Sequence, residues 1–197
     1  QFDLYPNSNV RMLMPGSVPT PRALNEEEMI IEYFKHDAEM WDLNVEDYRG
    51  RFEDFRVDLQ KQKRKLAESK GYDFSKFNDD QLTDNYHYGF FPNVYFSMKP
   101  DGNIFLRGTP HATDPNKCYF DMWYFTWFPD AQEEYYSFTM EEHKSKSTPV
   151  DHITGKFGEV SAGPGIDQDV GVWESQQQGL ASRGFKGDYM PNQERRI

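Results

Sequence analysis

The sequence predicts an α+β domain with a largely antiparallel sheet. Two amphipathic helical patterns come first, short strands with turn signals follow from Tyr86, and another helical pattern lies near the end. Helices and strands that are segregated along a chain are typical of α+β folds, whereas regular alternation indicates a parallel sheet. The length of 197 residues fits one domain of ordinary size.

The first part of the chain predicts a strand and then a helix. Within residues 1–22, a strand is expected at Val10–Met14, followed by a loop interrupted by prolines. A helix is expected from Ala23, with Asn25 as its N-cap and acidic residues in its first turn. Apolar residues then recur at helical spacing, which predicts one buried face: Ile30, Phe34, Ala38 and Trp41.

Residues 51–70 predict a second helix, which Gly71 ends. Phe52, Phe55 and Leu59 share one face and are candidate core residues. The basic tract near the end of this helix is expected to be a solvated face: Lys61, Lys63, Arg64 and Lys65.

The strand region begins with two runs of alternating side chains. Six residues are expected on one face: Tyr86, Tyr88, Phe90, Val94, Phe96 and Met98. A mixed polar and aromatic set is expected on the other: His87, Phe91, Asn93 and Tyr95. Three further strands are predicted: Ile104–Arg107, Cys118–Phe128 and Tyr135–Met140. The polar stretch Glu141–Thr148 is expected to be mobile.

Composition excludes several classes of function. A net charge of −11 argues against nucleic acid and against an anionic membrane surface as partners. The sequence has no run of about 18 apolar residues, the length that a membrane span needs. The single cysteine, Cys118, lies in an aromatic strand, is expected to be buried and inert, and forms no disulfide within the chain. We therefore expect a reducing, cytoplasmic location.

Val160–Ser182 predicts a long helix that carries two acids beside an apolar stripe. Helical spacing places Asp169 at the rim of the stripe and turns Asp167 towards solvent. A carboxylate near a core needs an ion pair, backbone N–H donors or a metal, and the pattern leaves these three open. The stripe itself is Ile166, Val170, Trp173 and Leu180, with Gln177 inside it.

Other chemical motifs are sparse. The histidines form no His-x-x-x-His or His-Glu-x-x-His pair, and Asp84 and His87 are interpreted as structural rather than metal-binding. No nucleotide loop and no activated nucleophile is evident.

Several motifs in order resemble a known family, the catalytic domain of the α subunit of Rieske-type aromatic ring-hydroxylating oxygenases. The motifs are Phe2–Tyr5, Asp84–Asn93, Arg107–Pro115, Phe120–Trp123 and Asp167–Leu180. Each motif is weak alone, whereas the ordered series covers nearly the whole chain.

The resemblance implies a fold and a metal site. The fold is a helix-grip (Bet v1/START-like) antiparallel sheet wrapped around a long C-terminal helix, with a cavity between them. The site is a mononuclear Fe(II) held by two histidines and one carboxylate, and Asp169 matches the carboxylate. The two histidines are expected upstream of Gln1. Residues 1–197 are accordingly expected to be a C-terminal catalytic domain, incomplete at both ends.

The resemblance also implies an activity and partners. An apolar or aromatic substrate is hydroxylated with O2 and electrons from NAD(P)H, delivered by a reductase or ferredoxin and a [2Fe–2S] Rieske domain outside this chain. The parent enzyme is expected to be a homotrimer or α3β3. Phe91, Asn93 and Trp173 are candidate substrate-binding residues, and this chain alone is expected to be inactive. The alternatives are a metal-free helix-grip module that binds a hydrophobic ligand, and a structural subunit.

Overall fold

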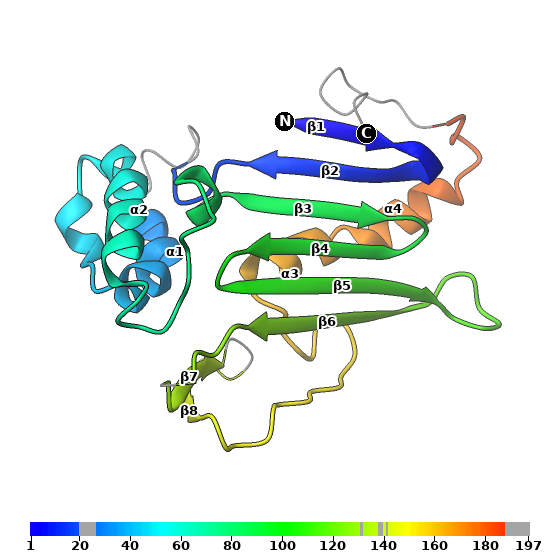
Figure 1. Cartoon of the computed structure of the whole chain (residues 1–197). Coiled ribbons are helices and arrows are strands. Elements are labelled where there is room, and N and C mark those ends of the chain that lie inside the picture. The colour runs from blue at the N-terminus through cyan, green and yellow to red at the C-terminus, as the bar shows by residue number, and fades with distance from the viewer. Residues whose placement is uncertain (20–26, 131, 138–139, 141, 188–197) are drawn as a thin grey trace. The chain divides into compact units, whose positions relative to one another are not determined.

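A six-stranded antiparallel sheet runs through the protein, and its strands follow one another in chain order. The computed structural model describes the chain except residues 20–26, 131, 138–139, 141 and 188–197. Figure 1 shows the strands as a simple meander. The strands are β1 (Phe2–Tyr5), β2 (Asn9–Met14), β3 (Asn85–Phe90), β4 (Val94–Lys99), β5 (Gly102–Pro110) and β6 (Cys118–Thr126). The predicted α+β class is confirmed.

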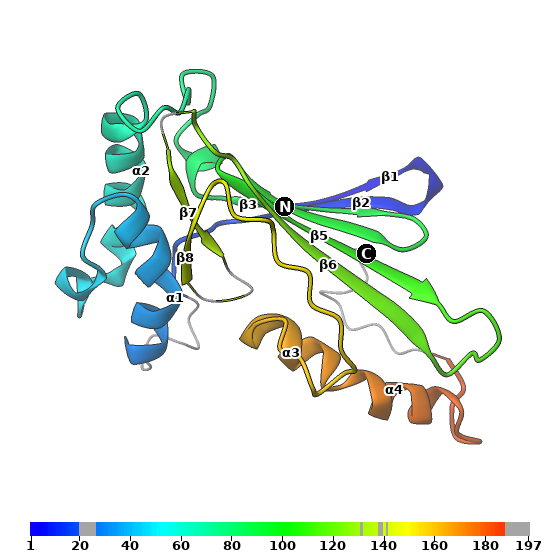
Figure 2. The same cartoon turned by 90° about the horizontal axis from the view of Figure 1, so that it is seen from below.

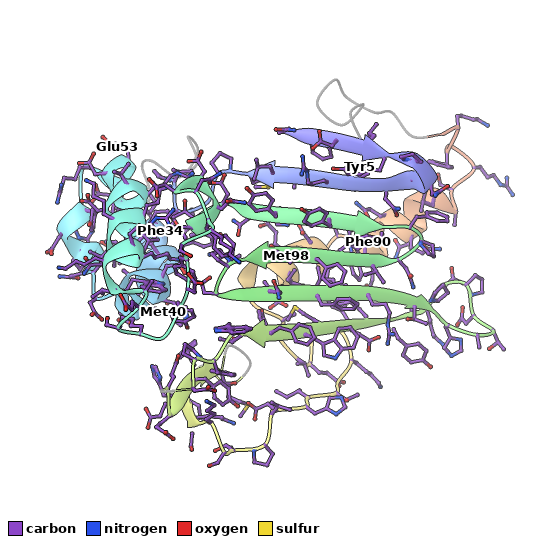
Figure 3. All side chains as sticks on the ribbon, viewed as in Figure 1. Tyr5, Phe34, Met40, Glu53, Phe90 and Met98 are labelled. Atoms are coloured by element: carbon purple, nitrogen blue, oxygen red, sulfur yellow. The ribbon has the colours of Figure 1, made fainter. Side chains whose placement is uncertain are left out.

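The register confirms the predicted face of β3 and β4. Tyr86 lies opposite Met98, Tyr88 opposite Phe96, and Phe90 opposite Val94. Residues paired across antiparallel strands point to the same side, so these six side chains share a face. Phe90 and Met98 are labelled on these strands in Figure 3. The strand β1 was not predicted; it pairs with β2 after a short turn.

The first of two units, Gln1–Phe105 with Tyr124–Gln132, contains the helices α1 (Glu27–Met40) and α2 (Phe55–Leu66). The predicted apolar faces of both helices are buried, and the rings of Phe34 and Phe55 stack 4.8 Å apart. Figure 3 labels Phe34 in this helical region. Every hydrophobic residue that is fully buried in the described part of the chain lies between Ile30 and Leu82.

The end of helix α2 and the environment of Lys63 differ from the sequence predictions. Helix α2 ends at Leu66 rather than residue 70, and turns lead from there to Gly71, which has a positive φ of 84°. Lys63 was expected in solvent but is only 1% exposed. Its ammonium donates to Asp101 Oδ2 at 2.7 Å and to the Leu82 carbonyl at 2.9 Å, which explains how it is buried. The predicted N-cap Asn25 lies outside the described residues.

The second unit, Leu106–Trp123 with Glu133–Ile197, contains a small hairpin of β7 (Glu134–Ser137) and β8 (Glu142–Ser145). The sequence did not predict β8, which lies within the polar stretch that was expected to be mobile. Asp151 holds the hairpin, because its carboxylate accepts from Ser137 Oγ at 2.9 Å and from Lys144 Nζ at 2.6 Å.

The predicted long helix at Val160–Ser182 is two helices, α3 (Pro164–Val170) and α4 (Trp173–Leu180). Figure 2 shows the break between them. Glycine and a β-branched valine, Gly171 and Val172, occupy the break, and both residue types are weak helix formers. No helix within the described ranges has the length and apolar character of a membrane span.

Candidate functional site

Asp169, the predicted metal ligand, lies in the last turn of α3 and is exposed. Its predicted position at the rim of a buried stripe was wrong, because the stripe around it is largely open to solvent. Across the described ranges, its carboxylate makes no hydrogen bond or ion pair. The ion-paired interpretation of Asp169 therefore has no support among the described residues, and the carboxylate is available to a ligand.

Asp167 has the opposite environment from the one predicted. It is half-buried, and its carboxylate accepts from Ser161 Oγ at 2.6 Å and from the Ala162 backbone N–H at 2.8 Å. These two hydrogen bonds, with the hydroxyl of Ser161 the stronger influence, lower the pKa of Asp167 below its usual value. Asp167 thus connects the start of α3 to the preceding loop through hydrogen bonds, whereas the carboxylate of Asp169 is exposed.

The apolar stripe of α3 and α4 is only partly covered. Ile166 and Val170 are half-buried, whereas Trp173 is 37% and Leu180 49% exposed, so the predicted buried stripe needs correction. The break after Val170 changes the relation between the two halves of the stripe. Gln177, expected inside the stripe, is exposed and donates to Asn116 Oδ1 at 3.4 Å.

Trp173 anchors α4 to the sheet strand β6 within the second unit. Its ring meets the ring of Phe120 edge-on, with 5.1 Å between the centroids. Arg107 and Asp121 form an ion pair of 2.8 Å, and Arg107 also lies over the ring of Trp123. Since successive strand residues point to opposite sides, Phe120 lies on the side of β6 opposite Asp121 and Trp123.

Phe91 and Asn93, the other predicted substrate-binding residues, lie in the turn between β3 and β4 rather than on a strand face. Phe91 is 70% exposed, and its backbone N–H donates to Asn9 Oδ1 at 3.0 Å. The strand prediction failed here because the tight turn occupies residues 91–93. Both residues belong to the first unit, whereas Asp169 and Trp173 belong to the second.

A complete set of metal ligands does not come together within the described part of the chain. No three His, Cys, Asp or Glu side chains form a group that could hold a metal ion there. Asp84 is structural, as predicted, since its carboxylate binds Arg56 at 2.6 Å. Cys118 is exposed, so the prediction of a buried thiol was wrong. The described residues therefore do not by themselves fit a three-ligand iron site.

Comparison with known families identifies the chain. Residues 10–197 match the sequence model of the family described as ring hydroxylating alpha subunit (catalytic domain). The chain belongs to this family. The resemblance seen in the sequence motifs is confirmed, and the six-stranded antiparallel sheet with its helices agrees with the helix-grip fold of this domain. No curated protein and no solved structure matches this chain.

Membership of the family establishes the broad chemistry. Ring-hydroxylating alpha subunits are oxygenase components, and the family is one of non-haem iron oxygenases. The match extends over both units, which indicates that both belong to the catalytic domain.

Proposed function

We propose that this domain is the catalytic part of a terminal oxygenase α subunit that hydroxylates an apolar, aromatic substrate with O2. Electrons come from NAD(P)H through a reductase or ferredoxin, and then through a [2Fe–2S] cluster in a Rieske domain of the parent protein. The observation that carries the proposal is the family match over residues 10–197. The high aromatic content, 16% of the chain, supports an apolar substrate.

We propose Asp169 as the carboxylate ligand of a mononuclear Fe(II). Its exposure and its lack of a partner among the described residues support this role, because an ion-paired carboxylate would first have to exchange its partner. The two histidine ligands are proposed to lie N-terminal to Gln1. When bound, the iron supplies the activation of dioxygen, and Asp169 supplies negative charge that favours retention of the cation.

Trp173 remains the proposed substrate-binding residue of the second unit. It follows Asp169 by one turn along the chain, beyond the break, and part of its ring is open while the rest contacts Phe120. Phe91 and Asn93 are proposed to contribute from the β3–β4 turn. We further propose a cytoplasmic homotrimer or α3β3 assembly for the parent enzyme.

The alternative function is a metal-free helix-grip module that binds a hydrophobic ligand. The two functions differ in whether Asp169 controls iron binding.

Changing Asp169 to Ala in the full natural protein tests the proposal through its iron content. We expect iron per chain to fall at least about tenfold, since a charged ligand is lost. The matched control is Asp167→Asn, which removes charge two residues away but keeps an acceptor for Ser161, and which should retain iron. Equal iron content in the Asp169→Ala variant and the unmodified protein would show that Asp169 is not a ligand. A natural protein without bound iron would favour the metal-free module.

A further inference from the structure

Two polar side chains face each other in the middle of the sheet. His87 on β3 lies directly opposite Ser97 on β4, and Met12 on β2 lies opposite His87 on its other side. Paired residues of antiparallel strands point to the same face. Met12, His87 and Ser97 therefore form a row across three neighbouring strands, on the face opposite Tyr88 and Phe96.

The polar atoms of this row are available to a ligand. His87 and Ser97 are half-buried, and neither side chain makes a hydrogen bond or ion pair with any residue that the structure describes. Burial lowers the pKa of His87 below its usual value, so the imidazole is neutral at neutral pH. Both groups stay partly accessible, and a ligand that binds both takes the place of water as their hydrogen-bond partner.

The next row along the same face is apolar. Val10, Gly89 and Tyr95 lie opposite one another on β2, β3 and β4. A Cβ at Gly89 would lie 2.7 Å from Val10 Cγ2 and 3.3 Å from Tyr95 Cε1. The glycine thus lets the valine and the tyrosine ring close over the strand. On this side the polar row is bordered by Val10 and Tyr95, whose aliphatic and aromatic side chains suit a ring.

We propose that His87 and Ser97 are the polar anchor of a binding site for a ring compound with one uncharged oxygen substituent, a hydroxyl or a carbonyl. Val10, Met12 and Tyr95 contact the ring. A neutral imidazole and a hydroxyl can each donate and accept a hydrogen bond. Neither carries a positive charge, so they do not compensate a carboxylate. The site rests on the proposed function in that the bound ring is the substrate that the oxygenase hydroxylates.

The preference for an uncharged oxygen is tested by three probes with the same ring system: naphthalene, 2-naphthol and 2-naphthoate. Their dissociation constants for the full natural protein are measured by isothermal titration calorimetry. We expect 2-naphthol to bind about tenfold more tightly than 2-naphthoate, which corresponds to about 1.4 kcal/mol. Equal or tighter binding of 2-naphthoate would overturn the proposal.

Variants assign the effect to the two side chains. His87→Leu should weaken 2-naphthol binding about tenfold, the value of one or two hydrogen bonds, and leave naphthalene binding unchanged. His87→Gln should restore much of the binding, and Ser97→Ala should weaken it less than His87→Leu. Tyr88→Phe, which removes a hydroxyl from the opposite face, is the matched control. Equal effects of Ser97→Ala and Tyr88→Phe would contradict the assignment to Ser97.

A measurement on the unmodified protein tests the site even if the variants fail to fold. Long-range proton–nitrogen NMR spectra report the imidazole nitrogens of His87, and 2-naphthol should shift them while the exposed His152 stays unchanged. Unshifted His87 signals at saturating 2-naphthol would refute the site. Binding needs no electrons or oxygen. Intact binding without hydroxylation therefore counts against the proposed function alone, and hydroxylation that is insensitive to His87 counts against the site alone.

Discussion

Lys63 and Asp101 place opposite charges in the buried interior of the first unit. Lys63 follows Phe55 and Leu59 at helical spacing and shares their buried face, although its charge led to the expectation that it is solvated. Its partner could not be predicted, because Asp101 is 38 residues away in the sequence. Sequence periodicity thus predicts which side chains turn inward and does not predict the long-range partner that makes a buried charge tolerable.

Removing the charge of Asp101 should strongly destabilise the protein. In Asp101→Asn the Lys63 ammonium stays buried without its counter-ion, which typically costs about 3–5 kcal/mol. Urea denaturation measures the change in the free energy of unfolding. The control is Lys61→Gln on the same helix, where the ion pair with Asp58 is exposed and the expected change is below about 1 kcal/mol. Similar losses in the two variants would show that the burial of Lys63 does not matter.

In the candidate site, too, periodicity predicted which residues differ but did not predict their contacts. Helical spacing distinguished Asp167 from Asp169 but assigned their environments the wrong way round, because it assumed one continuous helix with a buried stripe. Asp167 has its partners in Ser161 and Ala162, ahead of the helix, where a helical wheel carries no information. His87 was interpreted as structural rather than metal-binding, and the alternation of its strand already placed it on the face opposite Tyr88.

Strand β8 is an element that pairing creates and that local pattern does not predict, whereas its partner β7 overlaps the strand predicted from Tyr135. The sequence of β8, Glu142–Ser145, has no apolar alternation, and only its register with β7 makes it a strand. By contrast, β3 and β4 alternate clearly, and their faces were predicted correctly. Periodicity therefore predicts strands that have an apolar face. It does not predict strands that are stabilised by hydrogen bonds and ion pairs of polar side chains.

The hairpin should lose stability in acid because of Asp151. Lys144, and then Ser137, stabilise its carboxylate and lower its pKa in the folded protein. This contribution is present above the ordinary carboxyl pKa and is lost as the pH falls through the lowered value, below about pH 4. Thermal unfolding should therefore show a lower midpoint for Asp151→Asn than for the unmodified protein at neutral pH.

The difference between those two midpoints should shrink in acid, since the Asp151 carboxyl of the unmodified protein is then uncharged like the amide of the variant. Asp169→Asn is the control, because that exposed side chain has no partner among the described residues, and its midpoint should match the unmodified protein throughout. A difference for Asp151→Asn that stays constant from neutral pH to about pH 3 would contradict a role for the charge.

Helix α4 should depend on the ring contact of Trp173 with Phe120. We expect Trp173→Ala to increase amide hydrogen exchange in α4 about tenfold, because an edge-on aromatic pair contributes about 0.5–1.5 kcal/mol beyond its buried area. Alanine is a good helix former, so a loss of helix propensity cannot explain the change. Leu180→Ala, at the other end of α4, is the control and should leave exchange at residues 173–176 unchanged.

At the scale of the whole molecule, the sequence predicted the α+β class and the order of helices and strands. Segregated periodicities were sufficient for that, because a meander needs no long-range crossover. The location of the core was less predictable. The aromatic strands looked as suitable for burial as the helices, yet every fully buried hydrophobic residue in the described ranges lies between Ile30 and Leu82. Composition gives the amount of apolar surface, and only the fold decides where it is covered.

The half-covered sheet has a consequence for how ligands act on this protein. A compound that binds to strands whose side chains are only partly buried covers apolar surface of the folded protein. It therefore stabilises the folded state in the way that a core side chain does, for as long as it is bound. Occupancy then raises the melting temperature, by an amount that grows with the ratio of ligand concentration to dissociation constant. The rise in melting temperature therefore reports which compounds bind to the sheet.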